Sequence, residues 1–510
     1  MLTTLLDRVA LHGDRIALSD QVDEYSARTV LSAARAIAEL LDQHNIAVGD
    51  RVGVLASPGL DYVAAMFAVW QRRAIFVPLC PDHPPAELDY VLTDSGACAL
   101  VIDPAHRALA ERLHSGLPTI EIDAHRHAVA GRDLPVAPDA GGQPGLDDAA
   151  LMLYTSGTTG RPKGVLHSHR TIAAQITCLV EAWGWVPEDR IVHFLPLHHL
   201  HGLVNQLLCP LWIGARCDML GRFDAQTVFD RLAQGGHTVF MAVPTVYTRL
   251  IDAWDAADES TRSRWSTGIR SLRVMLSGSA ALPVPVLERW REISGHVLLE
   301  RYGMTEIGIA LSNPLHGERR PGFVGSPVPG MEVRVVSDGA VVGGDGAAGE
   351  LEVRGANTFV GYWGRPEETA ASFTTDGWFR TGDRVSIDRG AFRIEGRLST
   401  DIIKSGGYKF SALEIESVLS GHPSIAECSV VGVPDDVWGE RIGAAVVLRN
   451  GATLDLEQLR AWARNELAPY KLPTLLHLAD ALPRNVMGKV LKPQARDLFG
   501  PGAAGATRVD

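Results

Sequence analysis

Short apolar segments alternate with segments of helical periodicity along the first third of the chain. The apolar runs 51–57 and 74–79 each have the length of a strand, and between them Val63, Phe67 and Trp70 recur at helical spacing. Strand–helix–strand alternation of this kind is typical of βαβ units, whose strands pair in parallel. We therefore predict a largely parallel sheet with helices on its faces for this part of the chain.

The same pattern continues toward the middle of the chain. The runs 238–244 and 272–279 begin as apolar stretches and end in proline or small residues. Strands that lead into a ligand crevice often finish in this way. The fold class that we predict is α/β, with a large N-terminal domain over residues 1–396 that contains several sheets and flanking helices.

The character of the sequence changes near residue 397. A helical segment at 414–419 precedes strand-like runs at 426–433 and 442–448. An amphipathic helix then begins near Leu456, and either Thr453 or Asp455 could cap it. This order of elements predicts a compact α+β unit of domain size.

We assign the boundaries from these changes in pattern. The small C-terminal domain covers residues 400–498, and residues 397–399 form the hinge before it. Residues 499–510 are rich in glycine and alanine, which favours a disordered tail.

The bulk composition narrows the classes of partner. The 510 residues include 60 acidic and 48 basic side chains, so the formal net charge is −12. This balance argues against nucleic acid as the main partner. The six cysteines form no Cys-x-x-Cys pair, which favours a reducing, cytoplasmic compartment. No apolar run approaches the ~20 residues of a membrane span, and no secretory signal pattern is present at the N-terminus.

The segment 154–164, Tyr-Thr-Ser-Gly-Thr-Thr-Gly-Arg-Pro-Lys-Gly, is the strongest candidate for chemistry. It follows a short apolar run that is expected to be a strand. Hydroxyls and exposed backbone N–H groups can surround phosphate oxygens, and a lysine adds a mobile positive charge. The spacing does not fit a Walker A loop, and a surface turn is the alternative. The candidate phosphate-binding residues are Thr155, Ser156, Gly157, Thr158, Thr159, Gly160 and Lys163.

A second glycine-rich segment, 344–349, satisfies Gly-x-Gly-x-x-Gly but is followed by a strand-like run. A dinucleotide site requires a helix at that point. We therefore interpret this segment as a glycine-rich hairpin.

Three further motifs follow the phosphate loop in a fixed order. They are Glu-Arg-Tyr-Gly-Met-Thr-Glu at 300–306, Trp-Phe-Arg-Thr-Gly-Asp at 378–383, and Pro-Arg-Asn-Val-Met-Gly-Lys at 483–489. Together with the loop, their order and spacing resemble those of the adenylate-forming enzymes, which include acyl-CoA synthetases, luciferases and adenylation domains of peptide synthetases. The resemblance extends from about residue 10 to about residue 495.

The resemblance implies a site for ATP and Mg²⁺. Thr305 would bind phosphate, and Glu306 would hold Mg²⁺, a cation that prefers oxygen ligands. Asp383 would accept hydrogen bonds from the ribose hydroxyls, and Arg397 would bind ribose or phosphate from the domain junction. The adenine would lie between Tyr302 and the wall formed by Gly278, Ser279 and Ala280. The remaining nucleotide-binding candidates in these motifs are Glu300, Arg301 and Gly303.

Lys489 corresponds to the family's C-terminal catalytic lysine, which stabilises the charge that builds up on phosphate in the transition state. With Lys163 and Thr305 it completes the catalytic set that we predict. We interpret the neighbouring Lys492 as a surface lysine.

The implied reaction converts a carboxylic acid and ATP into an acyl-adenylate, and a thiol then displaces AMP. In the family, the small domain is mobile and rotates between these half-reactions. This movement would bring Gly406, Gly407 and Tyr408 to coenzyme A. Many relatives have Asp or Lys at the hinge position that Ser399 occupies in this chain.

The acid pocket is expected to contain His199, His201 and Ser277. A diacid needs a cation for its second carboxylate, because an unpaired buried charge is very costly. We predict Arg249 in this role, with Arg289 and Arg301 as further candidates.

The sequence segments around residues 277, 300 and 399 resemble those of the malonyl-CoA synthetases. This resemblance implies that the acid substrate is malonate, with methylmalonate also possible. A medium-chain or aryl acyl-CoA synthetase stays open, and so does a stand-alone enzyme that loads a carrier protein. A luciferase-type monooxygenase would share every ATP motif. The sequence does not predict the oligomeric state.

Overall fold

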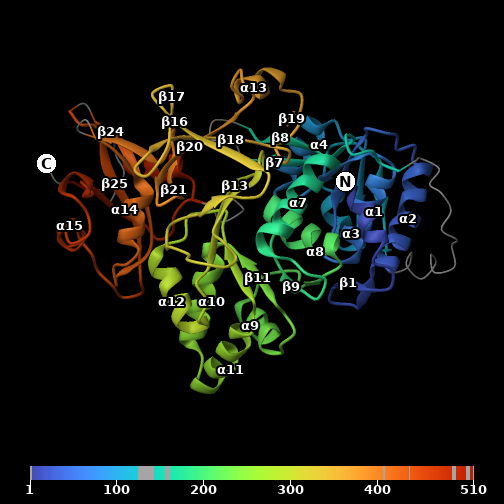
Figure 1. The fold of residues 1–510 in the computed structure, drawn as a ribbon, viewed down its shortest axis with the longest axis horizontal. Helices are drawn as coiled ribbons and strands as arrows, with labels where there is room; N and C mark the ends of the chain where they lie inside the picture. Colours follow the sequence, from blue (N-terminus) through green and yellow to red (C-terminus); the bar gives the residue numbers. More distant parts are fainter. Residues whose placement is uncertain are drawn as a thin grey trace.

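The structure is a computed structural model that describes residues 3–124, 143–155, 161–405, 408–435, 437–484, 490–500 and 506–508. Within these residues the strands form four sheets, with helices packed between and around them (Figure 1). The predicted α/β class is confirmed, with a large multi-sheet N-terminal part and a smaller C-terminal part.

The strands predicted at 51–57 and 74–79 belong to a sheet with seven strands among the described residues. The central strands pair in parallel, and the helix expected between them is α3 (Leu60–Gln71). The order across this sheet is β19 (Gly361–Tyr362), β8 (Lys163–Ser168), β7 (Ala149–Thr155), β4 (Ile75–Pro78), β3 (Arg51–Leu55), β5 (Ala99–Ile102) and β6 (Thr119–Glu121).

The runs predicted at 238–244 and 272–279 form neighbouring parallel strands in a second sheet, which has nine strands in the described chain. The order is β15 (Ser326–Pro327), β14 (Gly308–Ser312), β13 (Leu299–Met304), β12 (Val274–Ser277), β11 (Val239–Ala242), β9 (Arg190–His193), β10 (Arg216–Met219), β1 (Ile16–Ser19) and β2 (Glu24–Ser26).

A third, antiparallel sheet connects the two large sheets to the C-terminal part. Its order over the described residues is β17 (Ala340–Val342), β16 (Met331–Ser337), β18 (Ala348–Gly355), β20 (Phe379–Asp388) and β21 (Ala391–Arg397). The glycine-rich segment 344–349 leads into β18 and not into a helix, so the dinucleotide reading is excluded.

The C-terminal part has its own mixed sheet. In the described residues it contains β23 (Tyr408–Ser411), β22 (Ile402–Ser405), β25 (Gly439–Leu448), β26 (Leu475–Leu478) and β27 (Ala506–Arg508), and β24 (Ile425–Asp435) pairs with β25. Within residues 499–510, for which the sequence predicts disorder, residues 506–508 instead form a strand against β26.

Helices cover the faces of these sheets. In the N-terminal part they are α1 (Leu5–Ala10), α2 (Ala27–Gln43), α3, α4 (Pro85–Ser95), α5 (Arg107–Ala110), α7 (His169–Trp183), α8 (Cys209–Ile213), α9 (Ala225–Ala233), α10 (Pro244–Ala256), α11 (Glu259–Arg270), α12 (Val284–Ser294) and α13 (Pro366–Ala371). In the C-terminal part they are α14 (Ala412–Leu419), α15 (Leu456–Ala463) and α16 (Lys492–Asp497). Among the described helices, none combines the length and the hydrophobicity that crossing a bilayer requires.

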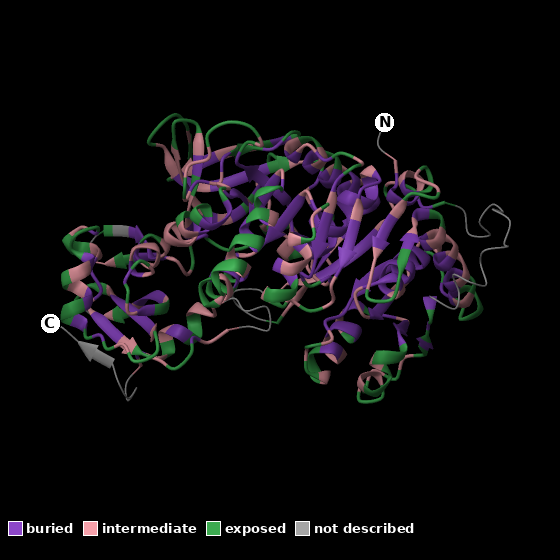
Figure 2. Ribbon diagram, turned by 90° about the horizontal axis from the view of Figure 1, so that it is seen from below, coloured by how far each residue is buried: buried purple, intermediate pink, exposed green. Residues whose placement is uncertain are grey.

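The apolar core follows the same division. One cluster includes residues from both large sheets and the helices between them, and Figure 2 shows these inner strands as mostly buried. Helix α3 is buried almost throughout, because apolar side chains cover its whole circumference. The C-terminal part has a separate cluster over residues 403–476, so it has a hydrophobic core of its own.

The N-cap of α15 gives a test of local stability. The Asp455 side chain accepts a hydrogen bond from the Gln458 backbone N–H at 2.8 Å, whereas the other candidate, Thr453, is exposed. Asp455→Ala is expected to destabilise the helix by about 1 kcal/mol. In hydrogen exchange, the amides of α15 would then exchange about fivefold faster.

Thr453→Ala is the matched control and should leave the exchange rate of α15 unchanged. Equal acceleration in both variants would show that Asp455 does not cap the helix.

Candidate active site

The strands that carry the phosphate loop are β7 and β8. Their antiparallel pairing sets Thr155 opposite Lys163, and residues 156–160 between them lie outside the described residues. The Lys163 ammonium forms an ion pair with Glu368 of α13 and lies 5.3 Å from the centre of the Tyr362 ring. The loop lysine is therefore held between α13 and β19, which are neighbours in Figure 1.

Next to this lysine lies the predicted Mg²⁺ ligand, Glu306. Its side chain is buried, and burial raises the pKa of its carboxyl group. The Tyr362 hydroxyl donates to Glu306 Oε1 at 2.9 Å, which favours the ionised form. A carboxylate oriented in this way beside Lys163, the predicted phosphate ligand, fits Mg²⁺, because that ion prefers oxygen ligands.

His167 fixes the backbone at Thr305. Its Nε2 donates to the Thr305 carbonyl oxygen at 2.9 Å. Burial lowers the pKa of His167 to about 4, so the imidazole is neutral at neutral pH. His167, which lies outside the motifs, thus fixes Thr305 to β8.

The predicted ribose ligand Asp383 contacts two other predicted residues. It is the cross-strand partner of Arg397 between β20 and β21, and Arg397 Nε lies 2.9 Å from Asp383 Oδ1. The Tyr302 hydroxyl donates to Asp383 Oδ2 at 2.5 Å. Burial, and secondarily the Asp383 charge, raises the pKa of Tyr302 well above its usual value. Three residues from separate motifs therefore form one group.

The predicted adenine wall includes Ser279, which has a backbone φ of 71°. Its Oγ lies 3.1 Å from His201 Nδ1 and accepts a weak hydrogen bond from Arg301 at 3.4 Å. A Cβ on Gly278 would lie 2.4 Å from Arg301 Nε, so only glycine allows the guanidinium this close to the backbone. His201, Ser279 and Arg301 therefore lie side by side.

Arg301 is a buried cation. Its side chain is 6% exposed, and no ion pair involving it is found among the described residues. Burial lowers its pKa to about 10, which still leaves the guanidinium charged at neutral pH. Since an uncompensated buried charge is costly, this position suits an anionic ligand.

Two other predicted substrate residues also carry unsatisfied polar atoms. Ser277 Oγ and His199 Nε2 are buried and have no hydrogen-bond partner among the described residues. Burial lowers the pKa of His199 to about 3. A Cβ on Gly202 would lie 2.3 Å from the Pro196 carbonyl oxygen, so glycine permits the tight turn that presents these histidines. The turn leads into a π-helical segment, His201–Leu208, of a kind that is frequent at functional sites.

Arg249 and Arg289 have different surroundings. Arg249 is exposed on α10, where its guanidinium carbon lies 5.7 Å from the centre of the Phe223 ring. No hydrogen bond in the described chain joins it to the other predicted pocket residues. Arg289 forms surface ion pairs with Asp255 and Glu292, at 2.5 and 2.8 Å. Of the three candidate arginines, Arg301 is the buried one.

In the C-terminal part, Gly406, Gly407 and Lys489 lie outside the described residues. Tyr408 is 55% exposed, and its ring stacks on that of Tyr470 with centroids 4.4 Å apart. A broad exposed aromatic face of this kind is available to a ligand.

The interpretation of Lys492 as a surface lysine is wrong. Its side chain is 13% exposed, forms an ion pair with Glu416, and donates to the Val430 carbonyl oxygen at 2.7 Å. It also lies 3.6 Å from Asp401, four residues beyond Arg397. Lys492 therefore connects α16 to the start of the small domain.

The site and the fold agree with what comparison with known proteins finds. The AMP-binding enzyme family matches residues 5–363, and the AMP-binding enzyme C-terminal domain matches residues 414–489. The chain belongs to the AMP-binding enzyme family.

Within that family the most similar proteins include malonate–CoA ligases. The bovine mitochondrial malonate–CoA ligase ACSF3 is 44% identical over 96% of this chain and 89% of its own length. ATP-bound MatB from Rhodopseudomonas palustris is 33% identical, with a TM-score of 0.87 over 98% of this chain and all of that one. A malonyl-CoA ligase with methylmalonyl-CoA and AMP bound is 38% identical, with a TM-score of 0.67 over 92% of this chain and 97% of that one.

The contact between Tyr362 and Glu306 predicts a pH effect. Tyr362→Phe removes a hydrogen bond to the carboxylate, so the pKa of Glu306 rises further. If the ionised carboxylate is needed for ATP-dependent turnover, the rate falls as the pH falls through this pKa. The acid limb of the pH–rate profile should therefore move about one unit toward higher pH in the variant.

Tyr25→Phe is the matched control, because Tyr25 also donates to a carboxylate, that of Asp20, at 3.2 Å. The control should retain the parent profile. An unchanged acid limb in Tyr362→Phe would contradict the role of this hydrogen bond.

Proposed function

We propose that this chain is an AMP-forming malonate–CoA ligase that also accepts methylmalonate. Membership in the AMP-binding enzyme family supports the adenylating chemistry. The names of the similar malonate–CoA ligases and the methylmalonyl-CoA complex support the choice of acid. The observation that carries the proposal is the buried guanidinium of Arg301, which lies beside Ser279 and lacks a carboxylate partner among the described residues.

In the first half-reaction, an oxygen of one malonate carboxylate attacks the α-phosphorus of ATP. The bond to the bridging oxygen breaks, and pyrophosphate leaves. Lys163, Thr305 and Lys489 bind the phosphates and stabilise the negative charge that builds up there. Mg²⁺, held at Glu306, would add positive charge beside the same phosphates.

Asp383, Arg397 and Tyr302 hold the nucleoside in this proposal. An ionised carboxylate such as that of Asp383 would accept hydrogen bonds from the ribose hydroxyls. The second malonate carboxylate pairs with Arg301, and the exposed Arg249 of α10 is the alternative cation for it. His199, His201 and Ser277 supply hydrogen bonds to the acid.

In the second half-reaction, the sulfur of coenzyme A attacks the acyl carbon, and AMP leaves with the bonding electrons of the acyl–oxygen bond. We propose that rotation about residues 397–399 exchanges Lys489 for Gly406, Gly407 and Tyr408 between the two steps. Such a hinge needs only a few residues at the end of an element, and β21 ends at Arg397.

We also propose a cytoplasmic location. The six cysteines are all free, which fits a reducing compartment. The bovine relative is named as mitochondrial. Subcellular fractionation of the source cell would show whether the protein is in the cytoplasm or in mitochondria.

The substrate is tested by AMP formation with ATP, Mg²⁺ and coenzyme A across malonate, methylmalonate, acetate, octanoate and benzoate. We expect the highest kcat/KM with malonate. A preference for octanoate or benzoate would reject the diacid and leave the adenylating chemistry in place. Turnover only with a carrier-bound thiol would indicate a loading enzyme instead.

Arg301→Met tests the diacid pocket. Loss of the cation leaves the second carboxylate unpaired, at a cost of about 2 kcal/mol or more. The kcat/KM for malonate should therefore fall at least ~30-fold, whereas the kcat/KM for butyrate should stay the same or rise.

Arg289→Met is the matched control, since Arg289 forms surface ion pairs outside the pocket. It should retain the malonate preference. Equal losses for malonate and butyrate in Arg301→Met would mean that Arg301 is structural and does not read the diacid.

A further inference from the structure

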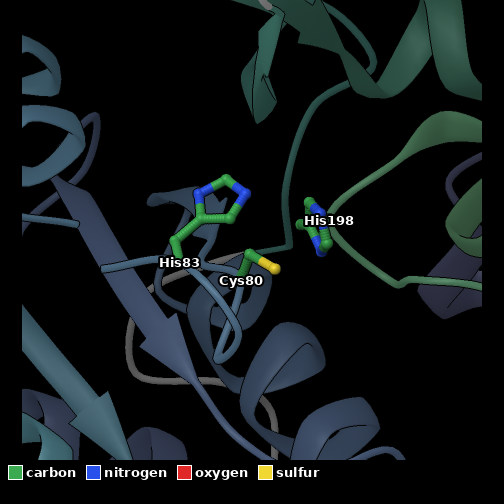
Figure 3. A group of neighbouring side chains, drawn as sticks. All are labelled: Cys80, His83 and His198. Atoms are coloured by element: carbon green, nitrogen blue, oxygen red, sulfur yellow. The ribbon is translucent and has the colours of Figure 1, made fainter. Parts of the chain in front are cut away.

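Cys80, His83 and His198 form a cluster that the adenylating chemistry does not use. Cys80 and His83 lie in the loop between β4 and α4, and His198 lies between β9 and the π-helical segment. Figure 3 shows the Cys80 sulfur between the two imidazoles. β4 belongs to the seven-stranded sheet and β9 to the nine-stranded one, so the cluster lies where loops from the two large sheets meet.

The spacing of the three side chains is close to that of a metal site. One ligand atom from each residue lies within 4.8 Å of the others. Zn²⁺ binds sulfur at about 2.3 Å and imidazole nitrogen at about 2.0 Å, so tetrahedral ligands lie roughly 3.3–3.8 Å apart. The ligand atoms would therefore need to move closer by at most about 1.5 Å to enclose Zn²⁺.

The surroundings of His83 leave one ring nitrogen available. Its Nδ1 lies 3.4 Å from a carboxylate oxygen of Glu87, and its Nε2 is buried and without a partner in the described chain. A carboxylate beside one ring nitrogen favours the tautomer that carries the proton on that nitrogen, which leaves a lone pair on the other. This arrangement is typical of histidines that bind zinc.

His198 shows the same unsatisfied state. Its Nε2 is buried and has no partner among the described residues, and its ring centre lies 5.5 Å from that of His83. Burial lowers the pKa of His198 to about 2, so the ring is neutral at neutral pH and can donate an electron pair. An unpartnered buried nitrogen needs an explanation, and a bound cation supplies one for both histidines.

Cys80 completes the set of ligands. Its side chain is 7% exposed, so solvent and oxidants have little access to the sulfur. A thiolate with two imidazoles selects zinc over magnesium, because Mg²⁺ prefers oxygen ligands. The Mg²⁺ ligand in the proposed function is a carboxylate, Glu306, so the two ions would not compete for one site.

We propose that Cys80, His83 and His198 bind one Zn²⁺, with water in the fourth position. On binding, the thiol proton is released to solvent and a sulfur–zinc bond forms. The ion links the loop after β4 to the turn that precedes His199 and His201. It would thereby hold the side of the acid pocket that these histidines form.

The test uses the full chain without a histidine tag, after treatment with a chelator. Zn²⁺ is added alone, and binding is measured by titration and by metal analysis after dialysis. Co²⁺ is added in a second series, because thiolate bound to Co²⁺ gives a charge-transfer absorption band in the near ultraviolet. The parent chain should bind one metal ion and show this band.

Cys80→Ser and His83→Gln are the informative variants. Each should weaken Zn²⁺ binding at least tenfold, and Cys80→Ser should abolish the charge-transfer band. Cys98→Ser and His114→Gln are the matched controls, since Cys98 is a partly buried free cysteine and His114 is an exposed histidine. Both controls should bind as the parent chain does.

Thermal unfolding separates lost binding from lost folding. Without metal, His83→Gln should unfold at the same Tm as the parent chain, because His83 lies in a loop. Added Zn²⁺ should raise the Tm of the parent chain and not that of the variant. Failure of the parent chain to bind Zn²⁺, or equal binding by the parent chain and both variants, would overturn the proposal.

Discussion

The contact of Asp383 with Tyr302 and Arg397 joins three parts of the molecule. Tyr302 belongs to the nine-stranded sheet, Asp383 to the antiparallel sheet, and Arg397 is the last residue of β21, which precedes the C-terminal part. The carboxylate is 6% exposed, so its charge is stabilised by these neighbours more than by water. The orientation of β21, and with it the start of the C-terminal part, therefore depends on the same carboxylate that is proposed to bind ribose.

Two other buried charges define where ligands can act. Arg301 retains its charge in a buried position, while burial favours the protonated form of Glu306. Both are expensive to bury without compensation. A cation at Glu306 and a carboxylate at Arg301 would each lower that cost. Bound malonate and Mg²⁺ would therefore neutralise the buried charges of Arg301 and Glu306.

Strands and helices could be predicted well where the pattern of neighbouring residues determines them. The strands at 51–57 and 74–79 and the helix between them follow from periodicity. The roles of Asp383 and Arg397 in binding ATP stay predictions. The contacts between motifs could not be predicted, because they depend on register. The pairing of Asp383 with Arg397 is set by the β20–β21 hairpin.

The error at Lys492 has the same cause, since its partner Glu416 lies 76 positions away in the sequence. Tyr362, His167 and Glu368 were missed for a related reason. Each acts on a motif residue from a different element, and none lies in a motif itself.

Cys80 and His83 are close in sequence, but His198 joins them only after the two sheets pack. Residues 156–160, 406, 407 and 485–489 lie outside the described structure, so their predicted roles rest on the resemblance alone.

The ion pair between Lys163 and Glu368 suggests how the phosphate site becomes available to a nucleotide. Glu368 is partly exposed, and the hydrogen bond from Lys163 holds the pKa of its carboxyl group below the usual value. An exposed ion pair of this kind contributes at most about 1 kcal/mol. A polyphosphate carries more charge than one carboxylate and would also engage the backbone of the loop. In the proposed function, phosphate would therefore replace Glu368 at Lys163, and the carboxylate would hold the lysine in place until then.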